Sequence, residues 1–534
     1  MFLVFSLSEM CIVVYKISLG YVLMIDLSRL NTSTTFSDVL KNNARSRPDH
    51  IAILEPQRNI SITYKELDDL VDQVAIWLDS KGVKQGGVVS VVVKNCIEYF
   101  PIYLGAIRLG GIINPFPATL SPFDLLKNLS YTEPDVVVCH DTHAAYIKSQ
   151  GFNVYELNLC NDIQFFDDIS IKDKISVVPD NVLDANAPAC LYYSSGTTDD
   201  PKGIIYSHDN MMSLIGSIVR GFGHNDSDQH LILLPLGHTA SINYSFLPAL
   251  YTGATIVLYD SYLRLRTNLW TAIEEHKITY MQVVPSILYS ILNTPFSTYN
   301  RDQVSSLSYV GCGSAPLSIH MQTEFQEKFD IPVANLYGLS ETGPTHFDNP
   351  LDSKWQPGSI GLPLDVNEIR FVDDEGTEVP IDDIGEIIVK GPNVFTDYFK
   401  NKELYSKVVI DGYFYTGDLG YIDSLGRQYF VERKKDLIIK AGVNIHPGEI
   451  EEVLYEHKSI AEVLVVGIDD EFYGEDVKCF AVLNKDNNAE HNIEQSILDF
   501  ARERLGLFKA PVSVEFVESL PKGPSGKYLR RALR

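Results

Sequence analysis

The sequence predicts an α/β protein: a large N-terminal domain of parallel-type sheets flanked by helices, a β-rich subdomain, and a small mobile α+β C-terminal domain. Two patterns support this prediction. Buried-strand runs alternate with helical segments from Phe36 onward, and near Asp373–Gly376 the chain changes to short β-like runs with glycine-rich turns. In addition, a chain of 534 residues is too long for one hydrophobic core and should divide into domains.

The first long helix has a clear start signal. Thr63 and Glu66 are spaced as a capping box, and apolar residues then recur at helical intervals as far as Leu78. The apolar run Val88–Val93 is typical of a strand that is buried on both faces, and Tyr99–Leu109 is expected to be helical.

The same alternation continues along the chain. Met211–Val219 is expected to be helical, and strands are expected at Asp135–Cys139, Leu231–Leu234, Ala254–Tyr259 and Tyr280–Val284. Because such alternation is typical of parallel strands joined by helices, it predicts parallel sheets with helices on both faces.

The β-rich subdomain is indicated by short runs and tight turns. Gly385–Lys390 is expected to be a strand, and Asp411–Gly412 and Leu425–Gly426 have the composition of tight turns.

A smaller α+β pattern follows the charged segment Glu432–Asp436, with a helix at Pro447–Glu456 and a strand at Ala461–Val466. Since charged, turn-like residues suit a hinge, the domain boundary is expected within this segment. The predicted division is an N-terminal extension outside the fold, a large N-terminal domain and a small mobile C-terminal domain, at residues 1–25, 26–434 and 435–534.

Composition limits the classes of partner. Hydrophobic residues make up 45% of the chain and charged residues 21%, as in ordinary soluble proteins. The net charge of −26 argues against nucleic acid and anionic membrane surfaces as partners. The seven cysteines include no Cys-x-x-Cys pair, which favours buried free thiols in a reducing compartment.

The first residues are apolar without resembling a membrane span. Glu9 and Lys16 interrupt residues 1–25, so no uncharged run approaches the roughly 18 residues that a span requires. A basic start and a small-residue cleavage site, which a signal peptide would have, are both missing. Met24 offers an alternative initiator, and a cytoplasmic location is predicted.

The densest chemical signal is a loop between two apolar runs, Ala187–Tyr193 and Ile204–Tyr206. The loop contains Ser194–Thr198 and ends at Lys202. Small residues let backbone N–H groups point into one concavity, hydroxyls add donors and the lysine adds charge, which together suit phosphate groups. The carboxylates of Asp199–Asp200 oppose an anion and should point away from it. An ordinary flexible surface loop is the alternative interpretation.

Further motifs follow this loop in a consistent order: Gly313–Leu317, Tyr337–Glu341, Tyr415–Asp418, Glu432–Asp436 and Pro524–Lys527. With these motifs the chain, from about Phe36 to Arg534, resembles the adenylate-forming superfamily. That superfamily contains acyl-CoA synthetases, firefly luciferase-like enzymes and peptide-synthetase adenylation domains.

The resemblance implies an ATP-dependent acid–thiol ligase. A carboxylic acid would attack the α-phosphate of MgATP and release pyrophosphate, and the acyl group would then pass from the adenylate to coenzyme A. The resemblance therefore implies an acyl-CoA synthetase, for example of fatty acid metabolism, that works as a monomer or homodimer with Mg²⁺. One alternative is a ligase that loads a carrier-protein thiol, or luciferase-like adenylate chemistry. Another is a catalytically dead nucleotide-binding protein.

The resemblance also implies a nucleotide site. Tyr337 is expected to stack on adenine, with Asn335 at the adenine edge and Gly313–Pro316 on the other side. Asp418 and Arg433 are expected to bind the ribose hydroxyls. The full set of expected ATP-binding residues is Ser194, Ser195, Gly196, Thr197, Thr198, Lys202, Gly313, Ser314, Ala315, Pro316, Asn335, Leu336, Tyr337, Gly338, Ser340, Asp418, Arg433 and Lys527.

Four residues are expected to be catalytic: Lys527, Thr198, Glu341 and His238. Glu341 and Thr198 would hold Mg²⁺, since a hard cation prefers oxygen ligands. Lys527 would enter the site for adenylation only and neutralise charge between the carboxylate and the α-phosphate. His238 falls where the family has a histidine near the acyl pocket, although a structural or solvated histidine is the alternative. Other histidines, such as His446, lack ligand spacing, so no transition-metal site is expected.

For thioester formation the resemblance implies a second arrangement of the domains. The small domain would rotate about Lys435 and present the CoA-binding residues Gly442, Val443 and Asn444.

Four positions depart from the family pattern. Asp199 replaces a small residue and is expected to lower ATP affinity, and Leu336 replaces a frequent glycine and is expected to shorten the acyl pocket. Asp397 has no direct chemical role, and Gly237 precedes His238 where the family often has an aromatic residue nearby. The acid itself is not predicted, because an apolar pocket discriminates by only ~1–3 kcal/mol per methylene.

Overall fold

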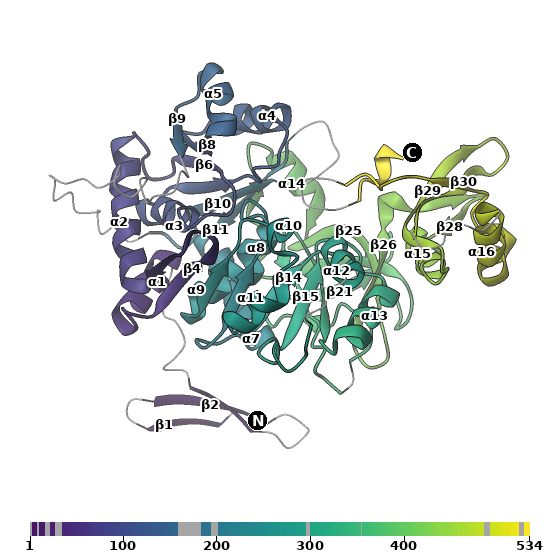
Figure 1. The fold of residues 1–534 in the computed structure, drawn as a ribbon, viewed down its shortest axis with the longest axis horizontal. Coiled ribbons are helices and arrows are strands. Elements are labelled where there is room, and N and C mark those ends of the chain that lie inside the picture. Colours follow the sequence, from purple (N-terminus) through teal and green to yellow (C-terminus); the bar gives the residue numbers. More distant parts are fainter. Residues whose placement is uncertain are drawn as a thin grey trace.

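The computed structural model describes residues 3–7, 10–16, 22–26, 35–157, 183–193, 201–294, 299–353, 355–484, 492–522 and 528–533. Two large sheets with their helices form the bulk of the molecule, and a C-terminal part projects from one side (Figure 1).

The first large sheet has seven strands in the order β23-β11-β10-β7-β6-β8-β9. The strands from β10 to β9 run parallel, whereas β11 and β23 add antiparallel pairs at one edge. The strands predicted near Val88 and Val136 are confirmed, and the two apolar runs that flank the candidate phosphate loop form the antiparallel pair β10–β11. The bounds are β6 (Val88–Val92), β7 (Ile112–Pro115), β8 (Val136–His140), β9 (Val154–Leu157), β10 (Pro188–Tyr193), β11 (Gly203–Ser207) and β23 (Asp397–Tyr398).

The second large sheet also has seven strands, in the order β16-β15-β14-β12-β13-β4-β5, and only β5 is antiparallel to its neighbour. The three strands predicted between Leu231 and Val284 are confirmed. The bounds are β4 (Ile51–Glu55), β5 (Ile60–Thr63), β12 (Gln229–Ile232), β13 (Thr255–Leu258), β14 (Tyr280–Val283), β15 (Tyr309–Gly313) and β16 (Val333–Leu336).

Helices cover both faces of the second sheet, as predicted. Alternate residues of a strand point to opposite faces, and Met281 and Val310 pack in one hydrophobic cluster whereas Tyr280 and Tyr309 pack in another. The helices of the large region are α1 (Phe36–Ser46), α2 (Tyr64–Ser80), α3 (Tyr99–Leu109), α4 (Pro122–Thr132), α5 (Asp141–Ser149), α7 (His208–Phe222), α8 (Thr239–Ser241), α9 (Leu247–Thr252), α10 (Tyr262–Leu265), α11 (Leu269–Glu275), α12 (Pro285–Asn293), α13 (Ile319–Phe329) and α14 (Lys402–Val408).

Helix α3 lies at the centre of the core, and every one of its residues is buried. Its single charge, Arg108, is compensated by Asp68 at 2.5 Å and Asp72 at 2.7 Å, because an unpaired buried charge would be costly. Helix α2, which provides both aspartates, begins at the predicted capping box of Thr63 and Glu66.

The β-rich part is built around a five-stranded antiparallel sheet. The predicted tight turn at Asp411–Gly412 joins two of its strands, and both residues have positive φ, 52° and 83°. The bounds are β17 (Gly338–Leu339), β18 (Gly343–Pro344), β19 (His346–Phe347), β20 (Leu362–Pro363), β21 (Glu368–Val372), β22 (Gly385–Lys390), β24 (Val409–Ile410), β25 (Tyr413–Ile422) and β26 (Gln428–Arg433).

The C-terminal part has its own sheet and its own hydrophobic cluster. The helix and strand predicted there are confirmed as α15 and β29. The bounds are η4 (Lys434–Asp436), β27 (Ile438–Lys440), β28 (Val443–Ile445), α15 (Pro447–Tyr455), β29 (Ile460–Asp470), β30 (Gly474–Leu483), α16 (Ile493–Lys509), β31 (Ser513–Phe516) and η6 (Arg530–Ala532).

The first residues form a separate three-stranded antiparallel sheet of β1 (Leu3–Leu7), β2 (Met10–Lys16) and β3 (Val22–Asp26). This sheet lies apart from the large region in Figure 1. In the part of the chain that the structure describes, no helix is both long and apolar enough to cross a membrane. Five cysteines are free and buried, as predicted: Cys96, Cys139, Cys190, Cys312 and Cys479.

Candidate active site

Several candidate site residues meet at the carboxyl-terminal edge of the second sheet. The segment Gly313–Pro316 leaves the end of β15, and Asn335–Leu336 ends the neighbouring β16. Gly313 pairs with Leu336 in the parallel register. A side chain at Gly313 would place Cβ 2.5 Å from the carbonyl oxygen of Leu336, so only glycine fits there. Ligands of open α/β sheets bind at this edge of the strands.

Leu336 is buried rather than projecting into open space. It is 5% exposed, and a Cβ built on Gly311 would lie 2.8 Å from its Cδ1 atom. The two glycines of β15 thus provide the volume that this bulkier residue occupies. Its expected effect on the length of the acyl pocket stays a prediction.

Asn335 is tied to a buried carboxyl group that the sequence analysis missed. Its backbone N–H donates to Asp348 at 3.0 Å, and its side-chain amide donates to the carbonyl of Ser359 at 3.1 Å. The indole N–H of Trp355 donates to the same Asp348 oxygen at 3.0 Å. Burial raises the pKa of Asp348 to about 7. Asp348 lies seven residues after the end of the Tyr337–Glu341 motif, and no pattern in the sequence indicated this role.

Tyr337, Asp418 and Arg433 form one connected set. The Tyr337 hydroxyl donates to Asp418 at 2.9 Å, across a separation of 81 residues in the sequence. The other Asp418 oxygen lies 3.2 Å from Nε of Arg433. Asp418 and Arg433 face each other in the register of β25 and β26, which explains why two distant motifs meet. The adenine and ribose roles of these residues stay predictions.

Glu341 lies in the short turn between β17 and β18. Its carboxylate accepts a hydrogen bond from the Tyr398 hydroxyl at 3.1 Å. Burial raises the pKa of Glu341, while the Tyr398 bond and the positive charges of Arg433 and Lys202 act in the opposite direction. Lys202, at the end of the candidate phosphate loop, is therefore close enough to influence this carboxylate. Tyr398 was not predicted from the sequence, because its place depends on β23 pairing with β11.

Two glycines shape this turn. A Cβ on Gly338 would lie 2.4 Å from the carbonyl oxygen of Gly343, and Gly343 has a φ of +62°. Only glycine satisfies both the close approach and the left-handed backbone without strain. The turn therefore presents Glu341 and Ser340 from a tightly constrained backbone.

His238 begins the short helix α8. Its Nδ1 atom accepts a hydrogen bond from the N–H of Ala240 at 3.2 Å, which is a capping role. The preceding Gly237 lies against the backbone of Phe116, where a Cβ would come within 2.2 Å of the carbonyl group. The departure from the family pattern at Gly237 is therefore required by packing. A role for His238 at the acyl pocket stays a prediction.

Some expected residues fall elsewhere. The loop Ser194–Asp200 and Lys527 lie outside the described residues, so the roles expected of Ser194, Ser195, Gly196, Thr197, Thr198 and Lys527 stay predictions. The CoA-binding candidates lie in the C-terminal part: Gly442 in the turn between β27 and β28, and Val443 and Asn444 at the start of β28, with Val443 48% exposed. Lys435 lies in the exposed turn η4 that follows β26.

Arg530 anchors the chain that follows the Lys527 segment, and no sequence motif indicated it. Its guanidinium lies 2.5 Å from Glu451 of α15 and 3.6 Å from Glu432 of β26. The carboxylate of Glu432 also accepts from the N–H of Gly448 at 3.2 Å. These contacts join the last strand before Lys435 to the C-terminal part.

A second contact connects the C-terminal part to the second sheet. Glu452 of α15 accepts a hydrogen bond from the N–H of His320, in the first turn of α13, at 3.0 Å. The first turn of a helix has free N–H groups and the positive end of the helix dipole, so a carboxylate is favourable there. Burial raises the pKa of Glu452, and the bonds to the backbone N–H groups of His320 and Ile319 oppose this shift.

Two family models match the chain. The model described as AMP-binding enzyme matches residues 40–399, and the model described as AMP-binding enzyme C-terminal domain matches residues 449–527.

Similar proteins share nearly the whole chain. A long-chain-fatty-acid–CoA ligase of Bacillus subtilis is 30% identical over 93% of this chain and 94% of its own length. An oxalate–CoA ligase of Arabidopsis thaliana is 29% identical over 93% of this chain and 98% of its own. Among solved structures, ATP-bound MatB from Rhodopseudomonas palustris has a TM-score of 0.84 at 28% identity, covering 93% of this chain and 98% of its own. The o-succinylbenzoate CoA synthetase of Bacillus subtilis with its acyl-adenylate has a TM-score of 0.81 at 26% identity, covering 93% and 97%.

Proposed function

Because the chain belongs to the family of AMP-binding enzymes, we infer that it is an ATP-dependent acid–CoA ligase, and we propose how its residues serve that reaction. Relatives named as ligases of fatty acids, oxalate and 2-succinylbenzoate support this activity across acids of very different shape. In the first step a carboxylate oxygen bonds to the α-phosphorus of ATP while the bond to pyrophosphate breaks. In the second step the sulfur of CoA, having lost its proton, bonds to the acyl carbon while the bond to AMP breaks.

The connected set Tyr337, Asp418 and Arg433 is the single observation that best supports the proposal. Asp418 is buried, and its carboxylate is held by a hydroxyl donor on one side and a guanidinium on the other. A carboxylate fixed in this way can accept hydrogen bonds from two adjacent ribose hydroxyls. The site therefore suits a nucleotide whose base lies by Tyr337 and whose phosphates extend toward Glu341.

Glu341 suits the role of a magnesium ligand. It is a half-buried carboxylate that is oriented by Tyr398 and lies within the electrostatic influence of Lys202 and Arg433. When bound, Mg²⁺ supplies charge neutralisation on the triphosphate, and oxygen ligands of this kind are the ones it prefers. We assign Glu341, with Thr198, to hold it. Tyr398 is a positioning residue for Glu341.

The remaining catalytic groups complete the charge pattern. Ser194–Thr198 and Lys202 would cradle the β- and γ-phosphates with N–H groups, hydroxyls and one ammonium group. Lys527 would neutralise charge that develops between the acid and the α-phosphate. His238 would border the acid.

The division at Lys435 is proposed to be a hinge between residues 26–434 and 435–534. Glu432 and Arg530 join the two parts by a few polar contacts, and parts of a chain that meet through small polar interfaces commonly move relative to each other. Rotation would withdraw Lys527 and bring Gly442–Asn444 toward the adenylate, so that CoA attacks in the second arrangement.

The decisive test is acid-dependent pyrophosphate release with ATP and Mg²⁺, with and without CoA. The acids should include oxalate, 2-succinylbenzoate, 4-coumarate and a series of fatty acids. We expect release with one acid class and faster turnover when CoA is added. Glu341→Gln should release pyrophosphate much more slowly, and Tyr146→Phe, at an exposed position of α5, is the matched neutral control.

The other candidate functions give different results. Release that CoA does not accelerate but an acyl-carrier protein does would indicate a carrier-loading ligase. Light emission or oxygen uptake that depends on the adenylate would indicate luciferase-like chemistry. A protein that binds ATP and releases no pyrophosphate with any acid would contradict the proposed activity.

A further inference from the structure

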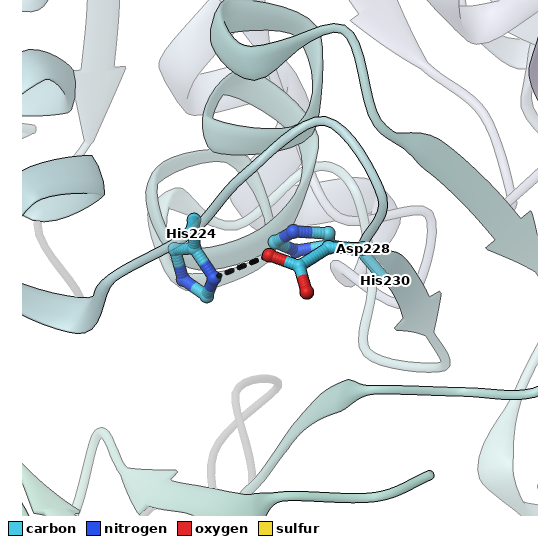
Figure 2. Close-up of side chains that lie close together, drawn as sticks. All are labelled: His224, Asp228 and His230. Atoms are coloured by element: carbon cyan, nitrogen blue, oxygen red, sulfur yellow. Dashed lines mark ion pairs between the residues drawn. The ribbon is translucent and has the colours of Figure 1, made fainter.

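A second group of chemically active side chains lies at the opposite edge of the second sheet. His224 and Asp228 lie in the loop between α7 and β12, and His230 lies in β12 itself. Their potential ligand atoms all lie within 4.8 Å of one another. Figure 2 shows the three side chains facing one another, with Nδ1 of His224 at 3.5 Å from Oδ2 of Asp228.

The two imidazoles are buried without satisfying their nitrogen atoms. His230 is 0% exposed and His224 is 8% exposed. Within the described part of the chain, both ring nitrogens of His230 and Nε2 of His224 have no hydrogen-bond partner. Buried polar atoms are nearly always hydrogen-bonded, because an unpaired one keeps the full cost of its lost hydration. Three such atoms in one cluster therefore require an explanation.

The carboxylate of the cluster is held in a fixed orientation. One oxygen of Asp228 accepts from the N–H of Asn225 at 2.8 Å, and the other accepts from the Thr279 hydroxyl at 2.9 Å. Thr279 itself accepts from the N–H of Gln229 at 3.0 Å. Carboxylates that bind metals are oriented by hydrogen bonds of this kind.

We propose that His224, Asp228 and His230 bind one divalent transition-metal ion, of which Zn²⁺ is the best match. Two imidazole nitrogens and one carboxylate oxygen suit Zn²⁺, whereas Mg²⁺ prefers oxygen ligands alone. The site is independent of the nucleotide site. Sequence spacing did not predict it, because the three residues become ligands only when the loop folds back beside β12.

The surroundings fit a metal site that fixes structure. The rings of Tyr280 and Phe222 lie beside His224 at centroid distances of 4.9 and 5.7 Å, and the adjoining loop 225–227 is exposed to solvent. Helix α7 begins next to β11, and β12 leads to the His238 segment. A metal ion here would hold the connection between these two elements at the end remote from the nucleotide.

The test is a Co²⁺ titration of the full chain, without a histidine tag, after treatment with EDTA and in the presence of saturating Mg²⁺. We expect one equivalent of Co²⁺ to give the visible absorption of a site with nitrogen and oxygen ligands, and one equivalent of Zn²⁺ to displace it. Metal should also raise the melting temperature, since an ion that binds only the folded state stabilises it.

The variants separate this site from chance binding. Thr279→Val removes a residue that orients Asp228, and it should lower the affinity for Co²⁺ by about 10–100-fold. His230→Gln and Asp228→Asn remove or alter a ligand itself and should lower the affinity by at least as much. His276→Gln, at a half-buried histidine that ends α11, is the matched control and should bind as the unchanged protein does. Circular dichroism shows whether each variant is folded.

Two results would overturn the proposal. The first is that the unchanged, folded protein binds neither Co²⁺ nor Zn²⁺ in the titration. The second is that folded His230→Gln and Asp228→Asn bind Co²⁺ as tightly as the His276→Gln control. If the buried variants fail to fold, the titration of the unchanged protein and of Thr279→Val decides the question.

Discussion

Two groups of buried polar residues, one at each edge of the second sheet, differ in how their polar atoms are paired. At the carboxyl-terminal edge the buried carboxyl of Asp348 and the amide of Asn335 bond to other protein groups. At the amino-terminal edge His224 and His230 leave three buried ring nitrogens without partners among the described residues. The side chains at the first edge are already held in place, as suits the exchange of substrate and product in the proposed function. The second edge is incomplete until something binds.

This difference follows from the topology. Parallel strands bring the starts of successive loops together at one edge, where motif residues from several segments meet. The other edge receives the ends of the preceding helices and loops, and there α7, β12 and β14 bring His224, Asp228 and Thr279 together. A substitution that changes activity, stability or metal binding at one edge and leaves the other edge unchanged would show that the two edges are independent.

The largest expected effect is on stability and comes from Asp348. Its pKa is about 7 in the folded protein and 3.8 when exposed, so between these values the folded chain keeps a proton that the unfolded chain has lost. The free energy of unfolding should therefore fall by up to about 4 kcal/mol as pH rises through this window. Below the window Asp348 costs no stability, and above it the loss is constant.

Urea unfolding of Asp348→Asn between about pH 5 and pH 8 checks this expectation, because the amide can still accept both hydrogen bonds and does not ionise. The stability of the variant should depend on pH less steeply than that of the unchanged protein. Glu327→Gln, on the exposed side of α13, should leave the slope as it is. Equal slopes for all three proteins would show that the Asp348 carboxyl is not held protonated.

The next largest effect is on the rate of adenylation. Glu341→Gln removes a charge that is oriented by Tyr398, and we expect ATP–pyrophosphate exchange to fall about 10²–10³-fold. The same variant should keep the Co²⁺ spectrum of the unchanged protein, since Glu341 belongs to the other edge. Full exchange activity in Glu341→Gln would remove it from the catalytic set.

A smaller loss is expected from Gly237→Ala. The new Cβ would lie 2.2 Å from the backbone of Phe116, so the chain must move, at a cost of ~1–3 kcal/mol in the free energy of unfolding. Because His238 follows directly, KM for the acid should rise as well. Gly448→Ala, where the nearest atom is 3.4 Å away, is the control. Equal melting temperatures for the two variants would mean that the backbone of Phe116 adjusts freely.

The smallest effect is expected from Tyr337→Phe. The variant loses only the hydroxyl that donates to Asp418, so stability should fall by about 1 kcal/mol. KM for ATP should rise several-fold with little change in kcat, since the ring remains beside the nucleotide. KM for ATP is measured from initial rates, with Tyr146→Phe as the control. An unchanged KM in Tyr337→Phe would contradict this expectation.

Much of the fold could be predicted because it depends on local patterns. The capping box at Thr63, the strand at Val88–Val92 and the helix Tyr99–Leu109 all appear where spacing and hydrophobicity placed them. The antiparallel pairs at the edges of both large sheets were not predicted, since a short strand such as β23 is stabilised by its neighbour and not by its own two residues.

The candidate site could be predicted in part, through the motifs that carry Glu341, Asp418 and Arg433. Tyr398 and Arg530 were missed, because each matters through a partner that is distant in sequence and neither lies in a motif with obvious chemistry. The spacing of His224, Asp228 and His230 did not indicate a metal site either, since histidines at such intervals also occur where no metal binds.

The sequence by itself determined the family and the alternation of helices and strands in the large region, and it indicated candidate residues for ATP and the acid, because motifs and periodic hydrophobicity are local properties of the chain. Tertiary structure alone decided which of those residues touch, as when Tyr337 meets Asp418 across 81 positions. It also decided which polar atoms are left buried without a partner, as in His230. Burial and pairing depend on the whole packed molecule, and no local pattern contains them.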